Sequence, residues 1–182
     1  TAGYGVGTRI EQVVLLPILG INTAIITIIA QNFGAQNYER IKETYIEAIK
    51  YALVIMITSS FIVFIFSNNI TSIFSNDRTV IEYGGKYLEI SAFVLSAYPI
   101  FFLSNGLFMG LKKSEYAMIS NLFRNVLNPI LVFYFAKLYS ASFEQFFWIW
   151  VIINWIFSIC YFLFTYNYIR SKLHQSRTVV NP

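Results

Sequence analysis

The chain has little charge: only 12% of its 182 residues are Asp, Glu, Lys or Arg. A typical soluble domain carries about 25% of such residues. Hydrophobic residues make up 57% of the chain and aromatic residues 19%. A compact soluble domain of this length has too little interior to bury so much apolar surface. We therefore expect lipid to be the solvent for most of the side chains.

Cysteine and histidine are also scarce. Cys160 is the only cysteine and lies in an apolar run, and His174 is the only histidine. A disulfide, a cysteine metal site and a Ser-His-Asp set are therefore excluded within the chain. The sequence has no GxxxxGK[ST] phosphate loop, and no strand precedes the glycines of GYGVG at 3–7, which we interpret as a close-packing helix surface. The sequence predicts no enzyme, no bound metal and no cofactor.

Long apolar runs dominate what is present, and a membrane-spanning helix needs about 20 mostly apolar residues. Five segments meet this requirement, and their apolar runs are continuous, unlike the alternating strands of membrane barrels. We predict an all-α fold, a polytopic membrane helix bundle whose short links make neighbouring helices antiparallel. Residues 1–170 form this transmembrane lobe and 171–182 a polar tail, with helices at 4–31, 44–67, 83–111, 116–138 and 143–169.

The lysines and arginines between these helices predict an orientation. With antiparallel helices, one side of the membrane receives Arg40, Lys42, Lys112, Lys113, Arg170, Lys172 and Arg177. The other side receives Arg9, Arg78, Lys86 and Lys137. The side richer in Lys and Arg is usually cytoplasmic. We therefore expect a multi-pass protein of the plasma membrane with a cytoplasmic C-terminus.

Three of the predicted helices contain an internal proline: Pro17, Pro99 and Pro129. Proline removes a backbone hydrogen bond and bends a helix, and a moving bundle can use such a kink as a hinge. Tyr98 stands beside Pro99, and Asn105 follows about two turns later. Together they can place polar groups and freed carbonyl groups in a central cavity.

Ionisable residues inside membrane helices are costly and usually face a bundle interior or water. Arg9 and Glu11 are two residues apart, so they point to different sides of the first helix. Either both extend to the outer interface, or Glu11 binds a proton or a cation in a water-filled cleft. Glu89 follows Lys86 by three residues, which favours a local ion pair at the interface.

A polar stripe marks the fourth predicted helix. Asn121, Arg124, Asn125 and Asn128 have the spacing i, i+3, i+4 and i+7, which places them on one face of an α-helix. One interpretation is adhesion between helices through hydrogen bonds worth about 1 kcal/mol or less each. The other is the wall of a cavity in the cytoplasmic half of the membrane.

The polar stretch AQNFGAQN at 30–37 ends the first apolar run. Gln31 and Asn32 can hydrogen-bond the last carbonyl groups of the helix. Gly34 can adopt the left-handed conformation that terminates a helix. We interpret the stretch as a helix stop and packing corner in preference to a substrate site.

Two stretches resemble the C-terminal lobe of the multidrug and toxic compound extrusion (MATE) transporters: GVGTRIEQVVLLPILGINTAIITIIAQNFGAQN at 5–37 and GLFMGLKKSEYAMISNLFRNVLNPIL at 106–131. The resemblance covers nearly the whole chain. It implies two six-helix lobes related by a pseudo-two-fold axis, of which this chain supplies the eighth to twelfth helices. The chain starts at Thr1 without an initiator Met, so we expect it to be a piece of a longer protein.

The resemblance also implies a function: multidrug efflux across the prokaryotic inner membrane by antiport of organic cations or drugs. Transport would proceed by alternating access and would be driven by a proton or sodium gradient. The expected partners are membrane lipid and the missing N-terminal lobe, and no nucleic acid is expected. Some members carry a cation-binding Asp where this chain has Tyr98, which leaves Glu11 as the deeply placed acid. The alternatives are a flippase of lipid-linked oligosaccharides and a non-transporting membrane partner subunit.

Overall fold

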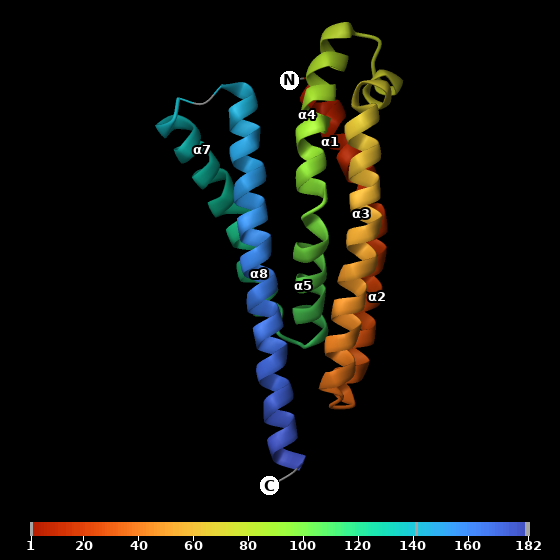
Figure 1. The fold of residues 1–182 in the computed structure, drawn as a ribbon, viewed down its shortest axis with the longest axis vertical. Coiled ribbons are helices and arrows are strands. Elements are labelled where there is room, and N and C mark those ends of the chain that lie inside the picture. The colour runs from red at the N-terminus through yellow and green to blue at the C-terminus, as the bar shows by residue number, and fades with distance from the viewer. Residues whose placement is uncertain (1, 141, 181–182) are drawn as a thin grey trace.

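The computed structural model describes residues 2–140 and 142–180, and within them every element is a helix. Figure 1 shows the elements as one elongated bundle of roughly antiparallel arms. In chain order they are α1 (Ala2–Val14), α2 (Leu16–Gly34), α3 (Tyr38–Phe74), α4 (Arg78–Leu95), α5 (Tyr98–Gly110), α6 (Ser114–Leu122), the π-helical turn η1 (Phe123–Leu127), α7 (Asn128–Leu138) and α8 (Phe143–Val180).

The predicted all-α membrane bundle is confirmed, with its five helices present as five arms. The arms are α1 with α2, α3 alone, α4 with α5, α6 with η1 and α7, and α8 alone. Among the described residues, α2, α3 and α8 are each long and apolar enough to cross a membrane. The bent pair α4–α5 adds a fourth span when it is counted as one.

Each internal proline lies within the first two residues of a helix, because its missing N–H costs nothing there. Pro17 is the second residue of α2, Pro99 of α5 and Pro129 of α7. The axes of α4 and α5 meet at 47° just before Pro99. The kinks predicted at Pro17 and Pro99 are thus breaks between helices, whereas at Pro129 α7 continues directly from η1, and the use of these sites as hinges stays a prediction.

Two arms are longer than the apolar pattern predicted. The side chain of Asn37 caps the start of α3 by accepting a hydrogen bond from the backbone N–H of Arg40 at 3.1 Å. α3 then runs to Phe74, with one non-helical residue at Phe66 (φ −104°, ψ 18°). α8 continues to Val180, through most of the residues predicted as a tail at 171–182. Polar side chains alone therefore did not end this helix.

The helix stop at 30–37 is present, but Gly34 does not make it. Gly34 has no positive φ; the left-handed residue is Gln36, at φ 56°. The N–H of Asn37 donates to the carbonyl of Asn32 at 2.9 Å and the N–H of Gln36 to that of Phe33 at 3.1 Å, which is the Schellman pattern. The Asn32 side chain also donates to the Ile28 carbonyl at 2.8 Å, one turn back in the same helix and not to one of the last carbonyl groups.

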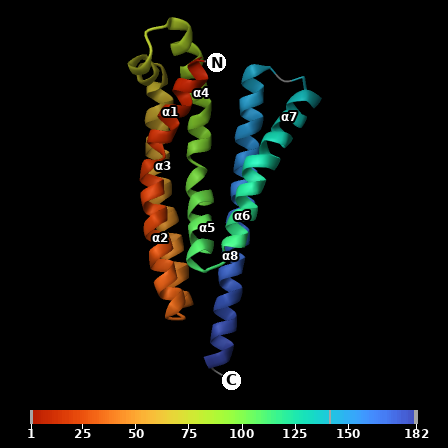
Figure 2. The same ribbon diagram turned by 180° about the vertical axis from the view of Figure 1, so that it is seen from behind.

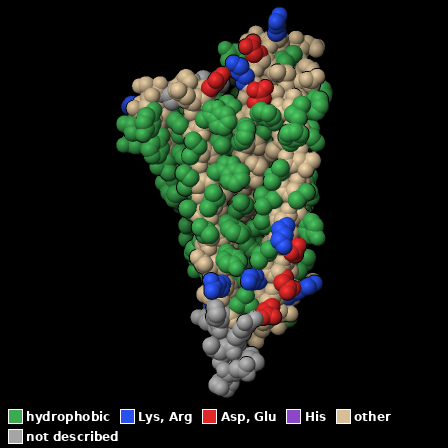
Figure 3. Space-filling model, viewed as in Figure 1, with side chains coloured by type: hydrophobic (Ala, Val, Ile, Leu, Met, Phe, Trp, Pro, Cys, Tyr) green, Lys and Arg blue, Asp and Glu red, His purple; other side chains and the backbone are tan. Residues whose placement is uncertain are grey.

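Charged side chains gather at the two ends of the bundle, and a broad apolar band lies between them (Figure 3). Large side chains such as Phe61 and Phe133 are more than 60% exposed there. The α2–α3 link, the α5–α6 link and the end of α8 lie toward the same end (Figures 1 and 2). The basic stretches predicted to share one side of the membrane therefore do share one end of the fold.

Candidate functional site

Glu11 is a buried carboxylate at the centre of three helix segments. Its side chain on α1 is 7% exposed. The Tyr87 hydroxyl of α4 donates a hydrogen bond to Oε2 at 2.7 Å, and the Tyr98 hydroxyl of α5 donates one to Oε1 at 3.0 Å. Since α4 and α5 meet at 47°, the two tyrosines lie on opposite sides of the bend. One carboxylate thus connects both halves of a broken helix.

Local packing fixes Tyr87 in this position. A Cβ atom added to Gly7, one turn before Glu11 on α1, would overlap the Tyr87 ring. Tyr4 and Phe147 contact the same ring edge-on, with centroid distances of 5.0 and 5.5 Å. The close approach at Gly7 therefore lets α4 bring its tyrosine to the carboxylate.

Arg124 lies beside Glu11 in an aromatic surround. Its guanidinium carbon is 4.3 Å from the ring centroid of Tyr98, 4.4 Å from that of Phe101 and 5.4 Å from that of Phe102. The side chain is half-buried and interacts electrostatically with Glu11. It projects from η1, so the α6–η1–α7 arm brings a cation to the α4–α5 bend.

Arg9 and Glu11 occupy different sides of α1, as their spacing predicted. Arg9 is exposed, whereas Glu11 is buried against α4 and α5. The interpretation that both side chains extend to the outer interface is therefore wrong for Glu11.

The polar stripe at 121–128 is not continuous, because η1 widens the helix at 123–127 and breaks the 3.6-residue repeat. Asn121 and Asn125 are exposed, and the Asn121 amide donates to the Ala117 carbonyl of its own helix at 2.8 Å. Asn128 is 2% exposed, and its Oδ1 has no hydrogen-bond partner among the described residues. Arg124 alone of the four reaches the Glu11 site.

A second polar cluster lies farther along α5. The buried Oδ1 of Asn105 accepts hydrogen bonds from the Ser120 hydroxyl at 2.6 Å and the Tyr161 hydroxyl at 2.9 Å. In the same region the hydroxyls of Tyr45 and Ser104 are 2.7 Å apart and share a hydrogen bond. This Asn105 cluster joins α3, α5, α6 and α8 through neutral groups only.

The predicted pair between Lys86 and Glu89 is wrong. Lys86 Nζ instead lies 3.2 Å from Glu144 Oε1, and the Ser67 hydroxyl donates to Glu89 Oε1 at 3.1 Å. Both charged side chains therefore connect α4 to other helices. Within 2–140 and 142–180, no group of three His, Cys, Asp or Glu residues is placed to hold a metal ion.

Tyr87 is not among the residues predicted for the site, although it makes the shortest bond to Glu11. One signal was present: Tyr87 and Tyr98 are eleven residues apart, close to three full turns, so they share a helix face. The bend at 96–97 and the contact with α1 are tertiary features, and no local pattern indicates them.

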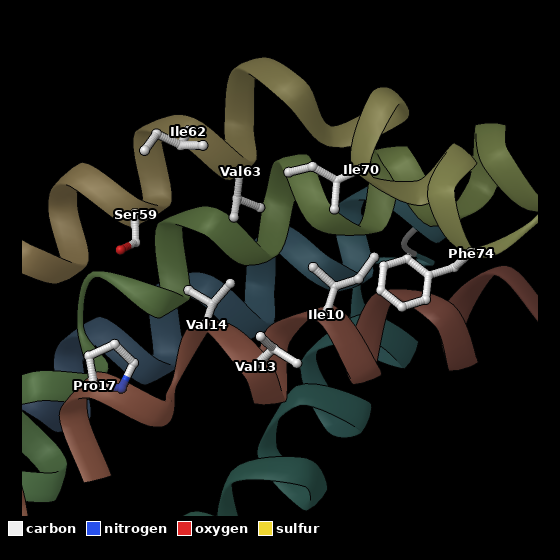
Figure 4. Close-up of a pocket in the computed structure, with 9 residues that line it drawn as sticks. All are labelled: Ile10, Val13, Val14, Pro17, Ser59, Ile62, Val63, Ile70 and Phe74. Carbon is white, nitrogen blue, oxygen red and sulfur yellow. The ribbon is translucent and has the colours of Figure 1, made fainter. Parts of the chain in front are cut away.

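An apolar pocket of about 340 Å³ opens on another side of α1. Figure 4 shows Ile10 and Val14 of α1 and Pro17 of α2 facing Ile62 and Val63 of α3 across it. Neither an acid nor a base lines this space. This pocket therefore lacks the ionisable groups that gather on the Glu11 side of the helix.

The MatE family profile matches residues 1–134 of this chain. The chain belongs to the MatE family. Its predicted resemblance to the C-terminal lobe of a MATE transporter is thereby confirmed.

One curated relative, the FAD transporter of Shewanella oneidensis, is 36% identical over 53 residues, which are 29% of this chain and 12% of that protein. A MOP superfamily transporter from Pyrococcus furiosus is similar in structure, with a TM-score of 0.88, 23% identity and coverage of 94% of this chain and 39% of that one.

A MATE transporter solved outward-facing gives a TM-score of 0.86 at 21% identity, covering 95% of this chain and 39% of that one. An inward-facing MATE structure gives 0.85 at 22% identity, covering 93% and 40%. The chain thus spans 39–40% of the length of these solved transporters. At such identities the likeness shows the fold alone.

Proposed function

We propose that this lobe belongs to a cation-coupled antiporter that exports organic cations and drugs across the plasma membrane by alternating access. A proton or sodium gradient supplies the energy, no cofactor takes part, and the C-terminus is cytoplasmic. The observation that carries the proposal is Glu11, a buried carboxylate with a tyrosine hydroxyl on each oxygen, at the point where a membrane helix breaks.

A carboxylate at this depth is costly unless it is neutralised or bound by donors. The two tyrosines supply donors when Glu11 is ionised. Binding of a proton or a sodium ion removes or redirects those hydrogen bonds. Because they connect α1 with both halves of the bent α4–α5 arm, the ion at Glu11 changes the forces on the bend. Ion binding and helix geometry are therefore coupled at one residue.

The lobe fold itself is compatible with alternating access. It matches an outward-facing and an inward-facing MATE structure almost equally, with TM-scores of 0.86 and 0.85. A lobe that keeps its shape between the two states moves as a unit against its partner lobe. Small changes at the α4–α5 bend are then amplified at the interface between the lobes.

Ethidium efflux from cells that express the full-length protein tests this proposal. Glu11→Gln keeps the size of the side chain but removes the charge and the exchangeable ion, so efflux should fall at least about tenfold, the effect of 1.36 kcal/mol on a rate. Glu89→Gln is the matched control, since Glu89 is half-buried and bonded to Ser67. Equal efflux in the Glu11→Gln variant and the wild type would refute the role of Glu11.

A second candidate is transport of an aromatic anion such as a flavin dinucleotide. It is favoured by the similarity to the Shewanella oneidensis FAD transporter and by Arg124, whose guanidinium lies against three rings and can also pair with phosphate. Proteoliposomes that contain the full-length protein separate the two candidates. Gradient-driven movement of ethidium supports the first, and movement of FAD without ethidium supports the second.

A further inference from the structure

Three aromatic rings on one face of α5 surround a single cation. Tyr98, Phe101 and Phe102 have the spacing i, i+3 and i+4, and all three rings approach the Arg124 guanidinium within 5.4 Å. Distances below about 6 Å between a cation and a ring centroid are typical of cation–π attraction. We call these three rings the aromatic cage.

The cage does not depend on Arg124 for its shape. Its rings contact each other edge-on, with centroids 5.6 Å apart for Phe101 and Phe102 and 6.1 Å apart for Tyr98 and Phe102. Phe101 also contacts the Phe157 and Tyr161 rings of α8 at 6.0 and 6.1 Å. Arg124 comes from a different arm of the bundle. Removal of its side chain therefore leaves the three rings supported.

The surroundings of the cage favour positive charge. Tyr98 donates its hydroxyl to Glu11, so a buried carboxylate lies directly behind one wall. Three electron-rich ring faces and one carboxylate all attract a cation. Arg124 supplies that cation in this structure and is only half-buried there.

We propose that the aromatic cage is a binding subsite for an organic cation, and that Arg124 occupies it as an internal competitor until substrate arrives. The proposal rests on the proposed export of organic cations and extends it to a named subsite. A planar or quaternary ammonium ligand takes the place of the guanidinium, whose long side chain moves toward its exposed side. One positive charge replaces another, so the Glu11 carboxylate keeps a cation beside it.

Ethidium binding to the purified full-length transporter, followed by its fluorescence, tests the competition. Arg124→Ala removes the competitor and should tighten ethidium binding about tenfold, in line with a cation–π gain of that order for a desolvated cation. Arg124→Lys keeps a cation near the rings and should bind ethidium like the wild type. Phe102→Leu added to Arg124→Ala should abolish the gain, because Phe102 is the half-buried wall of the cage.

Ethidium binding that is unchanged or weaker in Arg124→Ala would overturn the competition. Arg124→Gln, which is neutral and nearly as long, repeats the test where thermal unfolding in detergent shows that Arg124→Ala is poorly folded. The proposed function fails separately, through unimpaired efflux in Glu11→Gln. If efflux is impaired in Glu11→Gln but ethidium binding is no tighter in Arg124→Gln, the cage proposal is refuted and the proposed function is not.

Discussion

Two polar clusters among the described residues differ in charge and in the helices they join. The Glu11 cluster holds a carboxylate between α1 and the two halves of the bent α4–α5 arm, with Arg124 beside it. The Asn105 cluster joins α3, α5, α6 and α8 through one carboxamide and four hydroxyls. Its hydroxyls and carboxamide are joined by hydrogen bonds, and none of them carries a charge that could bind a transported ion.

We assign the neutral Asn105 cluster to adhesion between helices and the charged Glu11 cluster to the transport mechanism. Neutral hydrogen bonds between membrane helices contribute about 0.6 kcal/mol each on average, enough to hold helices in register. A buried carboxylate is more costly to maintain and is usually kept for ion transport. Substitutions in the Glu11 cluster should therefore affect transport, and those in the Asn105 cluster should affect stability.

Removing tyrosine hydroxyls should give the largest difference in ethidium efflux between the two clusters. The double variant Tyr87→Phe with Tyr98→Phe removes both donors from Glu11 and keeps both rings. Hydrogen bonds to charged groups contribute about 1.5–3 kcal/mol each, so gradient-driven ethidium efflux should fall about a hundredfold. Tyr45→Phe removes a hydroxyl bonded to Ser104 and should leave efflux near the wild-type rate. An equal loss of ethidium efflux in the double variant and in Tyr45→Phe would contradict the distinction between the clusters.

A smaller effect on transport is expected at Gly7. Gly7→Ala places a Cβ against the Tyr87 ring and displaces its hydroxyl from Glu11, so efflux should fall about tenfold. Gly5→Ala is the matched control, because nothing lies within 4 Å of its added Cβ. Protein level and thermal unfolding are measured for both variants. Similar efflux in the two would show that the contact between Gly7 and Tyr87 does not position the carboxylate.

Substitutions in the Asn105 cluster should change the stability of the lobe. Asn105→Leu leaves the Tyr161 hydroxyl without its acceptor, whereas Ser120 keeps its bond to the Ala117 carbonyl at 2.9 Å. The unfolding free energy should fall by about 1–2 kcal/mol. Adding Tyr161→Phe removes the orphaned hydroxyl and should recover part of that loss. A further loss in the double variant would contradict this explanation.

The smallest predicted effect concerns the α2–α3 turn. Gln36 has a left-handed backbone, which costs a non-glycine residue about 1–2 kcal/mol, so Gln36→Gly should stabilise the lobe by about 1 kcal/mol. Gly34 has no positive φ, and nothing lies within 4 Å of an added Cβ, so Gly34→Ala should not destabilise it. Destabilisation by Gly34→Ala in thermal unfolding would restore the sequence-based assignment of the helix stop.

The differences between the predicted and observed sites have specific causes. Apolar runs and prolines predicted the arms and their breaks, because both depend on local chemistry. The two-residue spacing also separated Arg9 from Glu11 correctly. The π-helical turn at 123–127 interrupts the regular repeat of the polar stripe, and Asn128 is buried whereas Asn121 and Asn125 are exposed, so its role as adhesion surface or cavity wall stays a prediction. Tyr87 was missed because its contact with Glu11 depends on how α1 packs against α4, which no local pattern indicates.

Glu11 is proposed to couple an ion gradient to substrate movement. This coupling can be measured as ethidium uptake into inside-out proteoliposomes of the full-length transporter, with and without an imposed proton or sodium gradient. The wild type should respond to one of the gradients, whereas Glu11→Gln should exchange ethidium at the same slow rate in all conditions. A gradient response in Glu11→Gln equal to that of the wild type would contradict the proposed role of Glu11.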